Sequence, residues 1–411
     1  MGIETVNNRR EIFIFYSIVL MLICLFISRA ALSVSMMIFF GLTLIHKNFV
    51  HQLSSFLKDK FLLITSLLFF IPFISGLWSD DLHSWLNITK TKLPFFLFPL
   101  SFAGNWQLTI EEWKKVGCTF IAVILIGCLW SLGHYIFNAT SIHQGYLQAK
   151  TLPTPLGNDH VRFSWIVAIA AIASVILIDL SKQQISKIIL ISIVIFFCVY
   201  LHILAARTGI LSLYIFFFLY ATHLIISRKH LKSSSVILCV VILLPLFAWF
   251  LMPTFQNRIK YFVYDFSFIE NQVYVPGSND GVRALSIQAG WAVLKKNPFG
   301  VGAGDVKRTT EIWYEQHVPN MIASDKFLPL NEWLMYGGFT GWIGVVLFTI
   351  VMIYPFFLKM KYKIFWIAFN LIAALSFVFD IGLEVQYGVF LYSFILLWWR
   401  KWFQEAPDYA R

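Results

Sequence analysis

The stretch GVRALSIQAGWAVLKKNPFGVGAGD, residues 281–305, lies in a long polar interval, 253–338, of a chain that otherwise consists mainly of apolar segments. Its first part predicts a helix, because Arg283, Ile287 and Trp291 recur every fourth residue and therefore share one face. An arginine and a tryptophan on that face make the helix a candidate wall of a binding site. The alternative is a helix that only packs against the rest of the protein.

A glycine-rich loop follows this helix. Asn297-Pro298 ends the helix, since the residue before a proline disfavours helical conformation. Gly300, Gly302 and Gly304 then leave the backbone with little side-chain bulk, so its N–H groups can approach an anion closely. Together with the arginine and the tryptophan of the helix, the loop predicts a site for a phosphorylated, lipid-linked substrate. Taken alone, a glycine-rich loop is better explained by simple packing.

Composition predicts an all-α integral membrane protein. Of 411 residues, 59% are hydrophobic and 13% are charged, whereas soluble domains carry about 25% charged residues. The net charge of +11 is explained by basic residues in cytoplasmic connections, and we expect no nucleic acid partner. All five cysteines fall in or beside apolar segments, so we expect no disulfide framework, no metal and no cofactor.

The apolar runs predict about twelve transmembrane helices. They divide the chain into residues 1–252 with nine helices, a periplasmic loop at 253–338 with the substrate site, and residues 339–411 with three helices and a cytoplasmic tail. Pro94 and Pro99 predict a kinked or partly re-entrant fourth span. The expected spans are 11–28, 31–45, 61–78, 86–104, 115–137, 161–179, 186–205, 208–226, 234–252, 339–358, 363–382 and 386–403.

The distribution of basic residues predicts the orientation. Alternate connections carry most of the lysines and arginines, which are enriched on the cytoplasmic side of membranes. We therefore expect a multi-pass protein of the bacterial inner membrane with both termini in the cytoplasm and the long loop in the periplasm. The basic residues in question include Lys58, Lys182, Arg228, Lys229 and Lys401.

Polar residues gather at the outer ends of the spans. Arg207, in the segment LAARTGIL, is either a cation facing an outer-leaflet phosphate or an arginine that reaches the interface from a helix end. Arg283 is a second candidate cation, with a solvated loop residue as its alternative. Two such arginines suit a diphosphate, because the planar guanidinium makes bidentate, charge-assisted hydrogen bonds.

Other polar residues allow a groove and a general base. Asp159, His160 and Arg162 line a groove or mark a helix start, with Asn158 or Asp159 as its cap. Each of Glu315, His317 and Glu332 is a candidate general base or a solvated loop residue. Asp380 and Glu384 are expected at the outer surface, where at least one of them pairs with an arginine.

These features together resemble the O-antigen ligase and polymerase superfamily of bacterial membrane glycosyltransferases. The resemblance rests on the twelve-span layout with one long outer loop and on three segments. The segments are A-A-R-T-G-I-L around Arg207, R-x7-W-x6-P-x-G-V-G-x-G from Arg283 to Gly304, and N-x-x-L-x-x-x-G-x-x-G from Asn331 to Gly341. The second segment is the most specific of the three.

The resemblance implies a metal-independent, inverting glycosyltransferase of the polytopic C type. Its donor would be a glycan on undecaprenyl diphosphate, and its acceptor a sugar hydroxyl on lipid A-core or on another glycan. Arg207 and Arg283 match the arginines that bind the diphosphate, with Gly302 and Gly304 beside them. Trp291 and Asn331 would join His160 and Arg162 in the groove.

The chain departs from the family at the expected histidine. The family places a histidine directly before the asparagine of the last motif, where this chain has Leu330. His317 can fold back into the site, Glu332 or Glu315 can replace the histidine, or the activity is specialised or lost. We favour His317, since a histidine acts near neutral pH without a large pKa shift.

Four functions compete at this stage. A ligase is favoured slightly over a polymerase, which has the same donor and a different acceptor. A flippase or exporter of lipid-linked sugars would carry charges deep in many spans, which this chain lacks. A structural scaffold is disfavoured by Arg207 and Arg283 in matching contexts.

A metal-independent reaction predicts that chelation has no effect. Glycan transfer by the purified protein should proceed at an unchanged rate in EDTA, because arginines rather than a metal stabilise the leaving group. A magnesium-dependent glycosyltransferase assayed in parallel would show that the chelator works. Inhibition that added metal reverses would contradict the prediction.

Overall fold

The computed structural model describes residues 9–157, 159–227, 231–270 and 273–405, and this part of the chain is helical without strands. Arg228, Lys229 and Asn158 lie outside the described residues. The α-helices are α1 (Arg9–Cys24), α2 (Arg29–Leu44), α3 (Phe49–Lys58), α4 (Lys60–Ile74), α5 (Leu82–Lys92), α6 (Pro94–Phe102), α7 (Ile110–Phe137), α8 (Ala139–Tyr146), α9 (His160–Leu180), α10 (Gln184–Leu204), α11 (Arg207–Ile226), α12 (Leu231–Leu251), α13 (Pro253–Glu270), α14 (Asp280–Lys296), α15 (Val306–His317), α16 (Glu332–Thr340), α17 (Trp342–Ile353), α18 (Lys363–Phe379) and α19 (Gln386–Glu405).

Six helical segments of the described chain are long and apolar enough to cross a membrane. They are α4 with its 3-10 extension to Leu77, and α7, α9, α10, α11 and α12. A seventh is added if α2 and α3, which are bent by 100°, form one broken span. The other expected spans coincide with helices that are shorter or less apolar, so the structure gives an all-helical protein with six or seven candidate spans.

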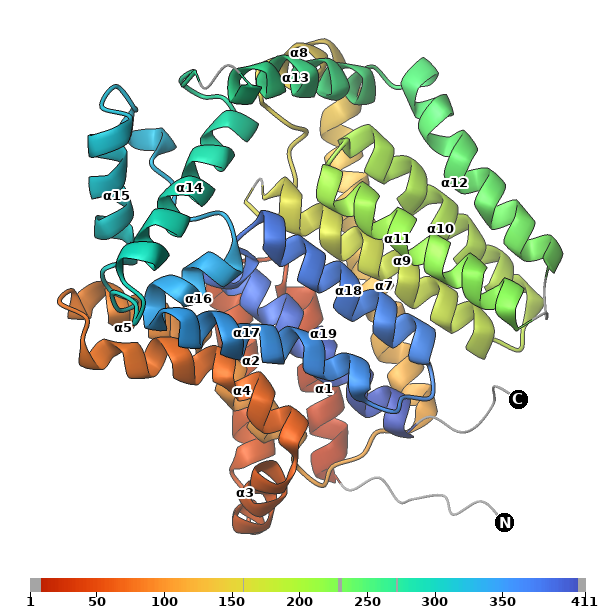
Figure 1. Cartoon of the computed structure of the whole chain (residues 1–411). Helices are drawn as coiled ribbons and strands as arrows, with labels where there is room; N and C mark the ends of the chain where they lie inside the picture. Colours follow the sequence, from red (N-terminus) through yellow and green to blue (C-terminus); the bar gives the residue numbers. More distant parts are fainter. Residues whose placement is uncertain (1–8, 158, 228–230, 271–272, 406–411) are drawn as a thin grey trace.

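Helix α9 forms the centre of the bundle. It packs against α7, α10 and α11 (Figure 1), and all its side chains from Phe163 to Leu177 are buried. Alanines at 168, 170, 171 and 173 let these neighbours approach closely. Helix α12, by contrast, lies at the edge of the bundle, and only 11% of its apolar segment Ser234–Leu251 is buried.

Helix α19 is buried although it is less apolar than the other expected spans. Phe390, Phe394, Trp398 and Trp402 stack along one side of it, and all four are inaccessible to solvent. Such large aromatic side chains supply most of the packing area of this helix. Helix α19 therefore lies inside the helical bundle and forms part of its core.

The fourth expected span is broken, as its prolines indicate. Helix α5 ends at Lys92, and Pro94 occupies the first turn of α6, a position that tolerates its missing N–H. The predicted end of the helix that carries Arg283 is also confirmed. Helix α14 ends at Lys296, and Asn297 is its C-cap.

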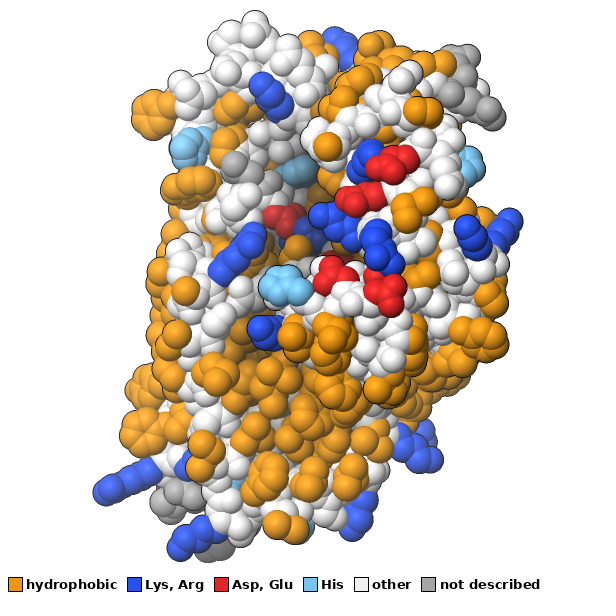
Figure 2. Space-filling model, turned by 90° about the vertical axis from the view of Figure 1, so that its left-hand side faces the viewer, with side chains coloured by type: hydrophobic (Ala, Val, Ile, Leu, Met, Phe, Trp, Pro, Cys, Tyr) orange, Lys and Arg blue, Asp and Glu red, His pale blue; other side chains and the backbone are white. Residues whose placement is uncertain are grey.

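Charge and apolar surface separate on the face shown in Figure 2. A broad apolar band crosses the molecule, a cluster of acidic and basic side chains lies in its upper half, and lysines and arginines fringe its lower end. The upper end is the one formed by α13, α14 and α15 (Figure 1). This separation is typical of a protein embedded in a bilayer.

A buried lysine joins three segments near this upper end. Lys92 is fully buried, and its Nζ forms an ion pair of 2.6 Å with Glu384 Oε1. Lys92 Nζ also donates to the backbone oxygen of Leu383 at 3.2 Å and to the hydroxyl of Tyr336 at 3.3 Å. Because Tyr336 lies on α16, the ammonium group links α5, α16 and the turn before α19.

Replacing this lysine should destabilise the fold strongly. Lys92→Met leaves Glu384 buried without its cation, which costs about 3–5 kcal/mol. The loss would appear as a lower melting temperature in detergent, and the double variant Lys92→Met, Glu384→Gln should regain part of it. Lys114→Met removes an exposed pair with Glu111 and should change stability by about 1 kcal/mol or less. Equal melting temperatures for Lys92→Met and Lys114→Met would contradict this role.

Candidate functional site

A cavity of about 590 Å³ lies between the first turns of α9 and α11, the end of α18 and the polar segment 253–338. Helices α11, α13, α14 and α18 supply most of its lining, and the first turn of α9 contributes His160 and Val161. Its charged lining consists of Arg207, Arg258, Arg283 and Asp280. The rest of the wall is mostly apolar and includes Leu211, Ile215, Phe262, Ile287, Leu375 and Phe379.

Arg207 is held by a bidentate ion pair. As the first residue of α11, it donates from Nη1 and Nη2 to the two carboxylate oxygens of Asp280, at 2.9 and 2.6 Å. Asp280 is held in turn by Asp265, whose Oδ2 accepts the backbone N–H groups of Asn279 and Asp280 at 2.9 and 2.6 Å. The pair therefore joins the start of α11 to the start of α14.

Arg283 follows Asp280 on α14 and lines the same cavity. Its guanidinium forms no hydrogen bond or ion pair with any described residue, although it is only partly exposed. Burial lowers its pKa, Asp380 and Asp280 raise it, and the nearby Arg207 lowers it further. An arginine stays charged despite such shifts, so Arg283 offers an unpaired cation to the cavity.

Arg258 is a cavity residue that the sequence analysis did not identify. It lies on α13 at 7% exposure, and its Nη1 is buried without a hydrogen-bond partner in the described part of the chain. Burial and the neighbouring Arg207 lower its pKa. The sequence does contain a pattern that indicates this residue. Arg258, Phe262 and Phe266 recur every fourth residue, and all three line the cavity.

Two of the predicted groove residues, His160 and Arg162, have different surroundings at the start of α9. Asp159 caps the helix by accepting the N–H of Arg162 at 3.1 Å. The guanidinium of Arg162 pairs with Asp159, approaches Asp380 at 3.4 Å and donates to the backbone oxygen of Ile381 at 2.8 Å. Arg162 is thus engaged in structural contacts outside the cavity lining, whereas His160 lines the cavity.

His317 does not line this cavity. It is the last residue of α15, where it is exposed and its ring stacks on Trp313 at a centroid distance of 4.5 Å. Its Nδ1 donates to the backbone oxygen of Trp313 at 2.9 Å. Among the described lining residues, His160 is the only histidine and Asp280 the only carboxylate.

Glu332 and Asn331 hold the start of α16. Glu332 is fully buried, and its Oε1 accepts the N–H of Leu383 at 2.5 Å while its Oε2 has no partner among the described residues. Burial raises the pKa of Glu332, nearby Lys92 lowers it, and Glu384 raises it again. Asn331 caps α16 by accepting the N–H of Leu334 at 3.0 Å and donates to the backbone oxygen of Val378 at 3.0 Å.

The remaining predicted groove residue, Trp291, also lies outside the cavity lining. Its ring is 43% exposed and packs edge-to-face against Trp342 at a centroid distance of 5.8 Å. The ammonium of Lys295 lies 5.5 Å from the centre of the same ring. An exposed aromatic pair beside a lysine is typical of a residue at a membrane interface.

The glycine loop packs tightly against two other segments. Its N–H groups donate to protein oxygens: Gly302 to Phe339 at 3.2 Å, Ala303 to Ser75 Oγ at 2.9 Å and Gly304 to Ser79 Oγ at 3.2 Å. Gly302 has a φ of +91°, which favours glycine. The packing alternative therefore accounts for Gly302 and Gly304, and we leave them out of the proposed site.

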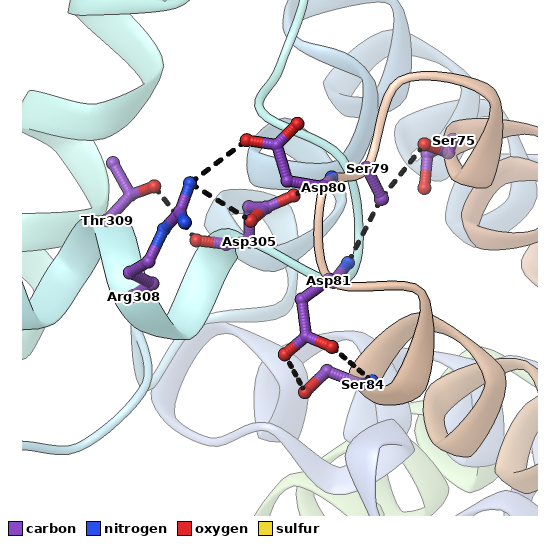
Figure 3. A network of polar contacts seen from close by, with 9 residues as sticks. Ser75, Ser79, Asp80, Asp81, Ser84, Asp305, Arg308 and Thr309 are labelled. Carbon is purple, nitrogen blue, oxygen red and sulfur yellow. Dashed lines mark hydrogen bonds and ion pairs between the residues drawn. The ribbon is translucent and has the colours of Figure 1, made fainter.

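The same junction continues as a polar network beyond the loop (Figure 3). Asp305 Oδ2 accepts the N–H of Asp80 at 2.6 Å. Arg308 pairs with the carboxylates of Asp80 at 3.1 Å and Asp305 at 3.4 Å. These contacts attach the start of α15 to the turn before α5, which explains the low exposure of Asp305.

No protein-family model and no curated protein matches the chain.

A methyl group at Gly304 tests the packing role of the loop. A Cβ there would lie 2.1 Å from the backbone oxygen of Asp81, so Gly304→Ala should destabilise the protein by about 1–3 kcal/mol through overpacking. Gly133→Ala is the control, because no atom lies within 4 Å of its Cβ and alanine favours a helix. Thermal unfolding in detergent measures both. An unchanged melting temperature for Gly304→Ala would contradict the packing role.

Proposed function

We propose that the protein is an O-antigen ligase-like glycosyltransferase. It moves a glycan from undecaprenyl diphosphate to a sugar hydroxyl of lipid A-core or of another glycan, at the periplasmic face of the bacterial inner membrane. In this proposal the chain crosses the membrane about twelve times and keeps both termini in the cytoplasm. A polymerase with the same donor is the closest alternative, and it differs only in the acceptor.

One observation carries the proposal: Arg207 and Arg283, which come from segments far apart in the sequence, line one cavity with a largely apolar wall. Guanidinium groups are suited to phosphate oxygens, and the wall formed by residues such as Leu211, Ile215 and Leu375 suits a prenyl chain. A ligand that combines an anionic group with a long apolar chain fits both parts. The lysines and arginines at the opposite end of the molecule support the orientation (Figure 2).

The chemistry follows from these positions. The acceptor oxygen forms a bond to the anomeric carbon of the glycan, and the bond between that carbon and the diphosphate oxygen breaks with inversion. The leaving diphosphate keeps the electron pair, and the arginines stabilise its charge. The hydroxyl proton passes to a base, for which we now prefer His160 over His317 because His160 lines the cavity.

Removing either arginine should slow transfer by about 10²–10³-fold, the usual effect of losing one preorganised donor to a developing negative charge. Purified Arg207→Gln and Arg283→Gln variants would be assayed with lipid-linked donor and either lipid A-core or lipid-linked acceptor. Arg308→Gln, whose arginine pairs with Asp80 outside the cavity lining, is the matched control.

The product formed in this assay separates ligase from polymerase. Full activity in both variants, at normal protein levels, would refute the proposed site. Loss of activity in Arg308→Gln to the same extent would show that the effect is one of folding rather than of the cavity.

A further inference from the structure

The cavity carries more positive charge than its own residues compensate. Three guanidinium groups line it, from Arg207, Arg258 and Arg283, and the only carboxylate among the described lining residues is that of Asp280. Asp280 is engaged with Arg207 through both oxygens. Neither Arg258 nor Arg283 forms an ion pair with a described carboxylate, although Asp380 and Asp280 lie near enough to raise the pKa of Arg283. A buried charge without a direct partner is unfavourable unless an anion accompanies it.

Arg258 is the more deeply buried of these two. It is 7% exposed, its Nη1 has no hydrogen-bond partner, and its guanidinium lies 5.9 Å from the centre of the Tyr261 ring. The neighbouring Arg207 repels it. Since a buried donor normally finds an acceptor, the position indicates a residue that can bind an anion.

The surrounding contacts fix Arg258 in place. One helical turn earlier, Thr254 donates its hydroxyl to the backbone oxygen of Ile203 at 2.7 Å. The preceding residue, Asn257, donates to the backbone oxygen of His143 at 2.9 Å. These bonds tie α13 to α10 and α8, so the helix that carries Arg258 is fixed beside the cavity before any ligand binds, which reduces the entropic cost of binding.

We infer that Arg258 is a phosphate-binding residue that makes the cavity select a diphosphate-linked over a monophosphate-linked prenyl sugar. This inference rests on the proposed function. A sugar joined to a prenyl chain through two phosphates carries one negative charge on each phosphate, and Arg258 and Arg283 supply one uncompensated cation for each. A monophosphate linkage carries a single charge and leaves one of the two arginines without a partner.

The test compares two synthetic probes that differ by one phosphate. They are N-acetylglucosamine joined to a geranylgeranyl chain through a diphosphate or through a monophosphate. Their dissociation constants are measured in detergent for the full-length wild type, for Arg258→Gln and for Arg258→Lys. The control is Arg400→Gln, because Arg400 is also a partly buried arginine, pairs with Asp59 at 2.5 Å and does not line the cavity.

The wild type should prefer the diphosphate probe, and Arg258→Gln should weaken its binding by about 10–100-fold, the equivalent of one charge-assisted contact. Binding of the monophosphate probe should change by less than about threefold, since Arg283 still binds its single phosphate. Arg258→Lys keeps the charge without the fork, so it should retain part of the preference. Arg400→Gln should retain all of it.

Other outcomes separate this inference from the proposed function. If the wild type binds the diphosphate probe and Arg258→Gln keeps the same preference, or weakens both probes equally, the inference fails and the proposed function stands. If the wild type binds neither probe, both fail. Melting temperatures measured without ligand identify a purely structural role of Arg258. If Arg258→Gln does not fold, the preference of Arg258→Lys for the diphosphate probe decides. A preference equal to that of the wild type in this variant refutes a role for the guanidinium.

Discussion

The ion pair between Arg207 and Asp280 is the contact on which the proposed site depends. It connects α11, a helix apolar enough to span the membrane, to α14, the helix of the polar loop, by two charge-assisted hydrogen bonds. Such bidentate pairs fix orientation as well as distance. Because Asp280 begins α14, the same contact brings Arg283 to the cavity less than one helical turn later. Asp280, the only acidic side chain among the described lining residues, is bound to Arg207 in this pair. Arg258 and Arg283 therefore have no lining carboxylate to pair with.

Several other charged residues of the described chain are paired. Lys92 binds Glu384, and Arg162 binds Asp159 and approaches Asp380. Removing one partner from such a buried pair lowers the stability of the fold strongly. These residues therefore stabilise the helix ends and are not proposed as ligand-binding residues. The distinction separates the proposed binding residues from the structural ones. Arg258 and Arg283 form no ion pair with a described residue, whereas Arg162 contacts two carboxylates.

The glycine loop shows how one pattern fits two roles. A run of glycines lets the backbone approach either an anion or another backbone segment, because both need the absence of a Cβ. In this protein Gly302 and Gly304 lie against the segment from Ser75 to Asp81, and their N–H groups already have protein acceptors. Close packing attaches the loop to the segment after α4 and to α16, and in the proposed function arginine side chains rather than this loop bind the phosphates.

The sequence by itself determined the helical, membrane-type architecture, the end of α14 at Asn297-Pro298 and the break before Pro94. Each follows from local properties: long apolar runs, and a proline that cannot continue a helix. It also singled out Arg207 and Arg283, because charged residues in apolar surroundings are conspicuous. Only the tertiary structure decided which residues share the cavity. Arg258 joined it and His317, Glu332 and Trp291 did not, since these positions depend on how α13, α14, α15 and α16 pack against distant segments, and no local pattern encodes such contacts.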